Sequence, residues 1–387
     1  MAEAPLPPPT ALQGLTPDEL ADACGIEIAD ARRIVSLAHR RGELPERAPA
    51  TIRRAALDAV RARCHLPTLE VVERTPSAVD PFVKYAFRLH DGAVIETVRI
   101  PLEKTGRFAV CVSSQAGCAL ACAFCATGRM GLTRNLETWE IVEQIRIVRR
   151  DLEAEHPGAR VHGVVFQGMG EPLANADRVF RAIRVLCEPS AQAIDRRNIT
   201  VCTAGLPAGI RRLAQEAPGA RLGVSLGSVR PGARRALMPI DNVHPLGEVL
   251  AAAGEHARAT GYAPMWAYTL LAGQNDADED AAHLAALVKD FAQAHGITPR
   301  LSLIPFNSIG DDALRRSDRL EAFRTVLFGA GVGSIVRYSG GGDVGAACGQ
   351  LARSGAPRRG ARAPGPPGAP VAAGGARVSM DPSVPSR

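Results

Sequence analysis

Residues 107–128, RFAVCVSSQAGCALACAFCATG, join a short apolar run to three cysteines with C-x3-C-x2-C spacing. The run at 107–113 predicts a β-strand, so Cys118, Cys122 and Cys125 fall in the loop at its carboxyl end. Three thiolates this close together repel one another unless a cation neutralises them. The stretch therefore indicates a metal or iron–sulfur centre on a strand-end loop.

The neighbouring sequence favours a cluster over zinc. A tetrahedral zinc site needs a fourth nearby ligand, and residues 126–155 contain neither His nor Cys. A [4Fe–4S] cluster held by three thiolates leaves one iron open to a small molecule. S-adenosylmethionine (SAM) can chelate that iron through its amino and carboxylate groups, and an electron from the cluster can then cleave it to a 5′-deoxyadenosyl radical. The spacing is similar to the signature of the radical SAM superfamily.

Outward from this stretch, apolar runs alternate with amphipathic helical segments. The predicted helices include 137–153 and 278–292, each with apolar residues on one face. The predicted strands are AVIETVRI (93–100), RFAVCVS (107–113), VHGVVFQ (161–167), NITVCT (198–203), RLGVSL (221–226), MWAYTLL (265–271), PRLSLIP (299–305) and SIVRY (334–338). This repetition predicts a parallel sheet, open or curled into a barrel, with its chemistry at the carboxyl ends of the strands.

Several of those strand ends carry residues suited to a ligand. Gly170 and Glu171 lie in a turn after the strand at 161–167, where glycine allows close backbone approach and a carboxylate can bind an ammonium group. Cys202, the Ser225-Leu226-Gly227 stretch and Asn307 end three other strands. In a barrel they would converge on one ligand; taken singly, each is also compatible with local turn chemistry.

Composition sets the remaining bounds. The 387 residues are 46% hydrophobic and 22% charged, as in ordinary globular proteins. The net charge is +6, but residues 349–387 hold six arginines against one aspartate, so the rest of the chain is close to neutral. No run reaches the roughly 18 apolar residues of a membrane span, the N-terminal residues lack the layout of a secretory signal, and the nine cysteines are an odd number. We expect a cytoplasmic protein with no membrane association and no structural disulfide framework.

The sequence divides into three parts. Residues 1–84 are predicted to form a small N-terminal helical accessory domain, because apolar residues recur at helical spacing from about residue 15 to 64. Residues 85–352 form the α/β core. Residues 353–387 are dominated by Gly, Pro, Ala and Arg and are predicted to be a disordered tail.

The order of motifs over residues 85–352 resembles the RlmN/Cfr family of radical SAM RNA methyltransferases. The motifs that carry this resemblance are CVSSQAGCALACAFCATG (111–128), GMGEPLAN (168–175), RRALMPIDNVHPL (234–246), YTLLAGQND (268–276), LIPFN (303–307) and GGDVGAACGQL (341–351). The resemblance implies an incomplete (β/α)6 radical SAM barrel behind a small helical domain. It also implies methylation of an adenine carbon, C2 more than C8, in ribosomal or transfer RNA.

Site residues follow from the same resemblance. Cys118, Cys122 and Cys125 would hold the [4Fe–4S] cluster, and SAM would bind Gly170, Glu171, Cys202, Ser225, Leu226, Gly227 and Asn307. Cys348 would carry a methyl group from one SAM as S-methylcysteine, and a radical from a second SAM would activate it for addition to the base. Cys111 would release the product through a transient disulfide with Cys348, and Glu96 would accept the proton from the adenine carbon. A reducing electron donor such as flavodoxin or ferredoxin is implied.

The chain departs from the family pattern in three places. The family usually has Ser at the position of Cys202, His at that of Gly227, and a more basic, polar tract where Tyr338-Ser339-Gly340-Gly341 stand.

Two other functions remain open on the sequence. A radical SAM enzyme acting on a peptide or metabolite would not need Cys111, Cys348 and Glu96 together. A catalytically silent RNA-binding protein with zinc at the cysteine triplet would tolerate Cys348→Ala.

Overall fold

A ten-stranded sheet organises the structure, a computed structural model that describes residues 10–352. Its strand order is β14-β13-β12-β11-β10-β9-β6-β5-β4-β3. The strands from β6 to β14 run parallel: β6 (Arg107–Val112), β9 (Arg160–Phe166), β10 (Ile199–Thr203), β11 (Arg221–Ser225), β12 (Met265–Leu270), β13 (Arg300–Pro305) and β14 (Ser334–Val336). Each predicted strand from 107 to 338 is therefore confirmed, within two residues at either end.

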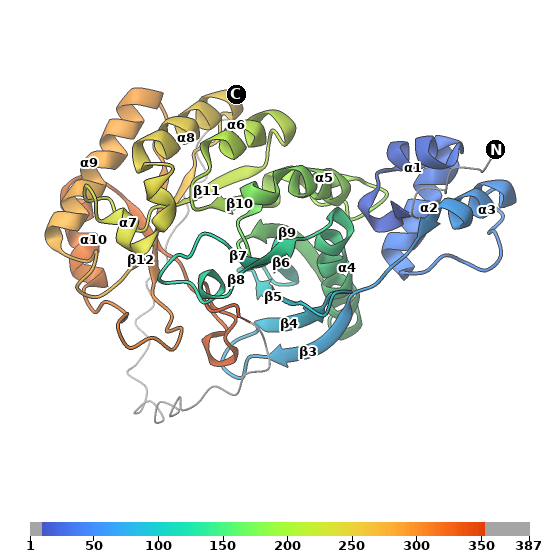
Figure 1. Cartoon of the computed structure of the whole chain (residues 1–387), viewed down its shortest axis with the longest axis horizontal. Helices are drawn as coiled ribbons and strands as arrows, with labels where there is room; N and C mark the ends of the chain where they lie inside the picture. Colours follow the sequence, from blue (N-terminus) through green and yellow to red (C-terminus); the bar gives the residue numbers. More distant parts are fainter. Residues whose placement is uncertain (1–9, 353–387) are drawn as a thin grey trace, which may run out of the picture. The chain divides into compact units, whose positions relative to one another are not determined.

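Helices cover the outer side of this parallel sheet (Figure 1). They are α4 (Thr138–Glu155), α5 (Ala176–Cys187), α6 (Pro207–Glu216), α8 (Leu246–Thr260), α9 (Asp278–His295) and α10 (Leu320–Gly329). The short α7 (Arg234–Leu237) lies instead at the carboxyl ends of β10 and β11, where Arg234 donates to the Ala204 and Leu226 carbonyls. Strand and helix alternate along the chain, and the two edge strands β14 and β3 do not pair with each other. This open α/β barrel confirms the predicted fold class.

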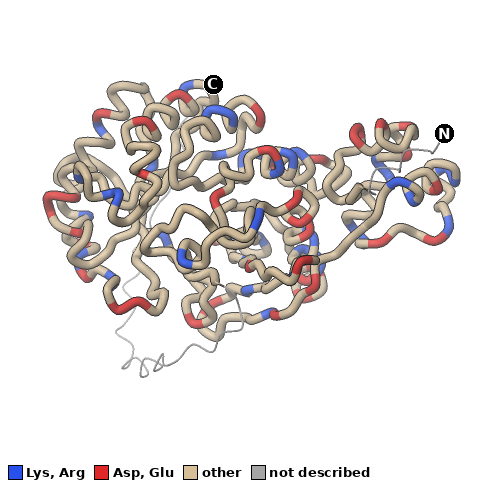
Figure 2. The backbone as a smooth tube through the Cα atoms, in the orientation of Figure 1, with Lys and Arg blue, Asp and Glu red and all other residues tan. Residues whose placement is uncertain are grey.

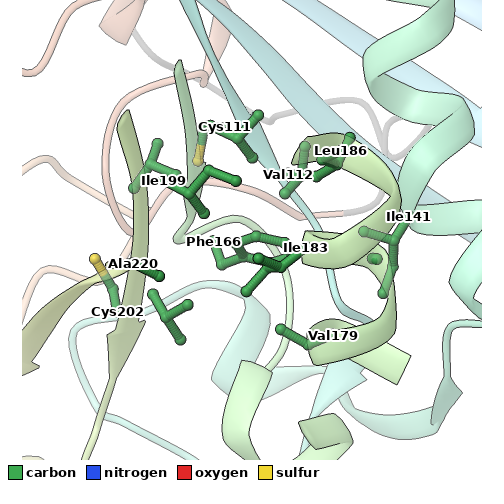
Figure 3. Close-up of a cluster of buried hydrophobic side chains, with 14 of the residues drawn as sticks. Cys111, Val112, Ile141, Phe166, Val179, Ile183, Leu186, Ile199, Cys202 and Ala220 are labelled. Atoms are coloured by element: carbon green, nitrogen blue, oxygen red, sulfur yellow. The ribbon is translucent and has the colours of Figure 1, made fainter. Parts of the chain in front are cut away.

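Side chains alternate between the two faces of the sheet. Val112 and Phe166 pack toward α4 and α5, as Figure 3 shows with Ile141, Val179 and Ile183. Cys111 and Cys202, one residue out of phase, point their sulfur atoms to the opposite face (Figure 3). The two-residue period of a strand thus places cysteines inside the barrel and aliphatic side chains under the helices.

Antiparallel strands extend the sheet beyond β6. They are β5 (Val94–Pro101), β4 (Val83–Arg88) and β3 (Glu70–Pro76). The boundary predicted between residues 84 and 85 therefore falls inside β4. The helical pattern ends at α3 (Arg54–Arg63), close to residue 64 as predicted, whereas β3 and the first residues of β4 add to the sheet.

Three helices precede the sheet: α1 (Pro17–Cys24), α2 (Ile28–Arg41) and α3. The start of α1 has a capping box, in which Thr16 and Glu19 satisfy each other's backbone N–H groups. Gly25 and Gly42 end α1 and α2 with φ of 64° and 75°, a conformation that favours glycine. Leu20, Ile34, Leu57 and Val60 are buried within the helical region.

The disordered tail predicted at 353–387 lies outside the described residues. Among residues 10–352, we find no helix that combines the length and apolarity needed to cross a membrane.

Candidate functional site

A cavity opens at the carboxyl ends of the parallel strands. It is lined by Cys118, Cys122 and Cys125, and by residues from the ends of β9 to β13: Gln167, Gly168, Gly170, Glu171, Cys202, Thr203, Ala204, Ser225, Ala267, Thr269, Ile304 and Asn307. Most polar residues predicted from separate strand ends therefore meet in one place. Convergence on one cavity favours a shared ligand over unrelated turns.

Cys118 ends β7 (Gln115–Cys118), and Cys122 and Cys125 lie on the loop that joins β7 to β8 (Gly131–Asn135). Burial raises the pKa of Cys118 to about 11 and that of Cys122 to about 12, and the neighbouring thiols add to both shifts. Without a cation the thiols stay protonated at neutral pH. Gly128 lets the loop turn back on itself, because a Cβ there would lie 2.9 Å from the Cys122 nitrogen.

Glu171 is buried at the base of the cavity. Burial raises the pKa of its carboxyl to about 7, while the N–H groups of Ala204 and Leu173, at 2.8 and 3.0 Å, lower it. The Glu171 N–H donates to Gln115 Oε1 at 2.8 Å. Gly170 has φ of 96°, and a Cβ there would lie 2.5 Å from that of Gln115, so only glycine fits.

The C-terminal segment brings Cys348 to the same cavity. Ser339 Oγ accepts the Cys348 N–H at 2.8 Å, and Asn307 Nδ2 donates to the Cys348 carbonyl at 3.1 Å. Two more bonds fasten this segment to the cysteine loop: Ala126 N–H to the Gly349 carbonyl (2.8 Å) and Thr127 Oγ1 to the Leu351 carbonyl (2.6 Å). Asn307, predicted as a ligand contact, thus also holds the backbone of Cys348.

A second cavity shares Gln167, Cys348 and Gly349 with the first. Cys111 lines it, together with Ile100, Val165, Arg337 and the 338–340 loop. Burial raises the pKa of Cys111, and Cys348 raises it further. Cys111 and Cys348, 237 positions apart in the sequence, therefore face one space.

Arg337 is a site residue that the sequence analysis did not assign. Burial alone lowers the pKa of its guanidinium, but Cys348, Cys202 and Cys111 outweigh burial and raise it. One arginine thus lies among three thiols from β6, β10 and the C-terminal segment. An arginine retained beside a sequence tract that otherwise departs from the family pattern was the signal available in the sequence.

Glu96 lies next to this group but lines neither cavity. Its fully buried carboxylate pairs with Lys84 Nζ at 3.2 Å and accepts the Ala352 N–H at 2.7 Å. Leu351, the residue before Ala352, lines the second cavity. Lys84, a second residue not singled out from the sequence, keeps the Glu96 charge compensated.

The three residues of the Ser225-Leu226-Gly227 stretch have different positions relative to the first cavity. Ser225 lines the first cavity, whereas the Leu226 side chain is fully buried in the core. Gly227 has φ of 70°, and a Cβ there would lie 2.6 Å from Met238 Sδ. Met238 itself lines the cavity, so its side chain fills space beside the position where the family usually has His.

Cys202, where the family usually has Ser, faces the cavity and donates weakly to Gln167 Oε1, with 3.7 Å between sulfur and oxygen. Burial raises its pKa to about 12, although Arg337 lowers it. At neutral pH Cys202 is therefore a thiol with hydrogen-bonding capacity similar to, but weaker than, that of serine.

Comparisons with known proteins agree with this site. Residues 112–285 match the Radical SAM superfamily. The sequence is 70% identical to a probable RNA methyltransferase of Sorangium cellulosum, over 96% of this chain and all of the other. It is 43% identical to the dual-specificity RNA methyltransferase RlmN of Syntrophobacter fumaroxidans, over 74% of this chain and 80% of that one. The chain belongs to the RlmN-type family of radical SAM RNA methyltransferases.

A solved structure extends the family match to the fold. The crystal structure of a radical SAM methyltransferase from Sphaerobacter thermophilus superposes with a TM-score of 0.79 at 36% identity, over 89% of this chain and 99% of that chain. The resemblance stated from the motifs is thus confirmed, and with it a radical SAM-dependent methyltransferase activity for the family.

The cysteine loop fits the cluster that the family implies. No three His, Cys, Asp or Glu side chains between residues 10 and 352 are grouped as ligands of one metal ion. Cys118, Cys122 and Cys125 all line the first cavity, where they could hold a four-iron cluster that takes each thiolate on a separate iron. The iron charge would also stabilise the thiolate forms of Cys118 and Cys122, which burial disfavours.

Proposed function

We propose that this chain methylates a ring carbon of adenine in ribosomal or transfer RNA, at C2 in preference to C8, with Cys348 as the methyl carrier. The observation that carries the proposal is the position of Cys348 in the wall shared by two cavities. The first cavity has the residues expected for the cluster and SAM, and the second has Cys111. Cys348 could therefore receive a methyl group in the first cavity and pass it to a base in the second while its loop stays in place.

The first cavity supports SAM binding through Glu171 and Asn307. The Glu171 carboxylate is held by two backbone N–H groups and can accept an ammonium group at the cavity base. Cluster and SAM together supply the methyl group and the radical that activates an otherwise unreactive aromatic carbon. The protein's part is to hold the cofactor next to the Cys348 sulfur.

The second cavity supports acceptance of the base. Its lining is largely apolar, from Phe82, Ile100 and Val165 to Ala346 and Leu351, which suits an adenine ring drawn out of an RNA strand. Cys111 lines this space beside Cys348. Once the base is joined to the Cys348 sulfur through the methylene group, the Cys111 thiolate can attack that sulfur: the S–S bond forms, the bond from sulfur to the methylene carbon breaks, and the electron pair stays with the carbon, which takes up a proton to become the methyl group. The resulting disulfide accounts for release of the methylated product and requires later reduction.

Glu96 is the proposed proton acceptor. Its link to the cavity is the Ala352 N–H bond to its carboxylate, because the preceding residue, Leu351, lines the cavity. Lys84 favours the charged carboxylate, the form that accepts a proton. A flavodoxin- or ferredoxin-type protein is the proposed electron source.

Nucleoside mass spectrometry tests the proposal. The full chain, reconstituted anaerobically with iron and sulfide, is given reductant, methyl-labelled SAM and deproteinised ribosomal RNA or bulk transfer RNA, beside a Cys348→Ala control. We expect labelled 2-methyladenosine that is lost in the control. An intact cluster that releases 5′-deoxyadenosine but labels no nucleoside would refute RNA as the substrate. Labelled 8-methyladenosine would overturn the assignment to C2.

A further inference from the structure

The rim of the second cavity carries an aromatic side chain that the proposed chemistry does not use. Tyr338 lines this cavity, yet its side chain is 71% exposed. The chain has four tyrosines and two tryptophans, so an exposed ring at this place is uncommon for it. The position falls in the tract where the chain departs from the basic pattern of its family.

Tyr338 is exposed but held in place. Its hydroxyl donates to Asp80 Oδ2 at 2.9 Å, and its ring meets Phe82 edge-on, with centroids 6.0 Å apart and planes inclined by 68°. Such a T-shaped contact can cover at most one face of the Tyr338 ring, so Phe82 leaves the other face uncovered. The ring is therefore oriented before any ligand arrives, which lowers the entropy cost of stacking.

The loop that carries Tyr338 is locked to the β3–β4 loop. Asp80 Oδ2 also accepts the Gly341 N–H at 2.8 Å, and Asp343 accepts from Ser77 Oγ and the Ala78 N–H, both at 2.8 Å. A Cβ at Gly340 would lie 2.4 Å from the Phe82 ring. A longer side chain at 340 is thus excluded by the same packing that positions Tyr338.

Charge near the ring points to a base rather than a phosphate. The carboxylates of Asp80 and Asp343 both lie in these two loops and would repel the RNA backbone. Figure 2 shows Lys and Arg mixed with Asp and Glu along the chain, without a continuous basic track. Stacking is neutral and suits every nucleobase.

We propose that Tyr338 is a recognition residue that stacks on the nucleobase next to the target adenine when that adenine enters the second cavity. This inference rests on the proposed function, because it assumes RNA as substrate. Stacking by Tyr338 then takes the place of the phosphate contacts that the more basic tract of the family would make. It binds the substrate and takes no part in the bond-making steps.

Steady-state methylation by the reconstituted full chain tests this role, first on deproteinised ribosomal and transfer RNA and then on a synthetic hairpin around the mapped adenine. Tyr338→Ala is compared with Phe328→Ala, which removes a ring that is 81% exposed on α10, outside both cavities. We expect Tyr338→Ala to raise KM for RNA about 5-fold or more, with kcat nearly unchanged. Phe328→Ala should match the wild type, and Tyr338→Trp should restore KM.

A hairpin that is abasic next to the target adenine gives a second readout. It should weaken binding to the wild type to the level of Tyr338→Ala, and leave Tyr338→Ala unaffected, because both changes remove the same contact. If the abasic hairpin weakened binding equally in the wild type and in Tyr338→Ala, or if Tyr338→Ala left KM unchanged, the inference would be overturned while the proposed function stayed intact. Failure of the wild type to methylate either RNA would instead refute the proposed function. Equal iron content and melting temperature in all variants show that the fold is preserved.

Discussion

The same residue type serves two regions of this molecule in different ways. At the barrel mouth, six cysteines line the two adjoining cavities: Cys111, Cys118, Cys122, Cys125, Cys202 and Cys348. In the helical region, Cys24 and Cys64 are buried against each other, with sulfur atoms 3.8 Å apart, and line neither of those cavities. Burial raises the pKa of Cys64 to about 12, with Cys24 adding to the shift.

Thiol pKa values alone do not separate the two groups, because burial raises the pKa of Cys111, Cys118, Cys122 and Cys202 at the barrel mouth and also that of Cys64 in the helical region. What differs is the space in front of the sulfur. A thiol that faces a cavity can meet a metal or a substrate, whereas a thiol packed on another thiol acts as a small hydrophobic side chain. We therefore expect a Cys→Ala substitution to abolish activity at the barrel mouth and to leave activity unchanged in the helical region.

Removal of one cluster thiol should have the largest effect. We expect Cys122→Ala to lose bound iron, its absorbance near 400 nm after reconstitution and all measurable methyl transfer, at least about 1,000-fold. Iron and sulfide analysis with the nucleoside assay checks this. A variant that kept four irons would show that Cys122 is not a cluster ligand, and facing the cavity would then not distinguish functional cysteines from structural ones.

Removal of the proposed carrier should stop methyl transfer but spare the cluster. Cys348→Ala is expected to keep the iron content of the wild type, because Cys348 is not one of the three thiols of the C-x3-C-x2-C motif, and its contacts with the cysteine loop are made by the backbone of neighbouring residues, which the substitution leaves in place. Labelled methyl should appear on the wild-type protein, at Cys348, and be absent from the variant, as peptide mass spectrometry can determine. Methylated RNA from this variant would exclude the carrier role.

Much of the barrel mouth could be predicted from the sequence because its motifs are local. The triplet spans eight residues, and Gly170 with Glu171 follows a strand directly. The alternation of predicted strands and helices indicated a parallel sheet, and in such a sheet these motifs lie at the same edge, where the strands end. The positions of Ser225, Cys202 and Asn307 in one cavity follow from that rule alone.

The rest depends on contacts between distant segments. The pairing of Lys84 with Glu96 crosses two antiparallel strands. The edge strand β3 was assigned to the helical domain because short edge strands carry a weak pattern, and the predicted boundary divided β4 after Lys84. Arg337 meets three cysteines from three elements, and no local motif reports such a meeting. Met238 beside Gly227 likewise needs the tertiary packing.

Acid should loosen the helical region before it affects the barrel-mouth thiols. His39 in α2 is buried, and its Nδ1 accepts from Gln192 Nε2 at 3.1 Å. Burial, Arg146 and Arg149 lower its pKa from 6.5 to about 4, so the unfolded chain binds the proton more tightly. The stability that depends on neutral His39 is present above pH 6.5 and is lost as pH falls toward 4, by up to about 3 kcal/mol.

Thermal or denaturant unfolding from pH 7 to 4.5 checks this, with His39→Gln as the matched variant. The stability of the variant should fall less over that range. A parallel decline in both proteins would mean that other groups cause the acid sensitivity.

The smallest effect should come from the thiols of the helical region, and it is the sharpest test of the comparison. Cys24→Ala removes one sulfur from a packed pair, which should cost about 1 kcal/mol of stability and lower the melting temperature by a few degrees. Iron content, SAM turnover and RNA methylation should all match the wild type, because this side chain lines neither of the adjoining cavities. If Cys24→Ala instead reduced methylation at unchanged iron content, the helical region would take part in substrate handling, and position relative to those cavities would not be what separates the two groups of cysteines.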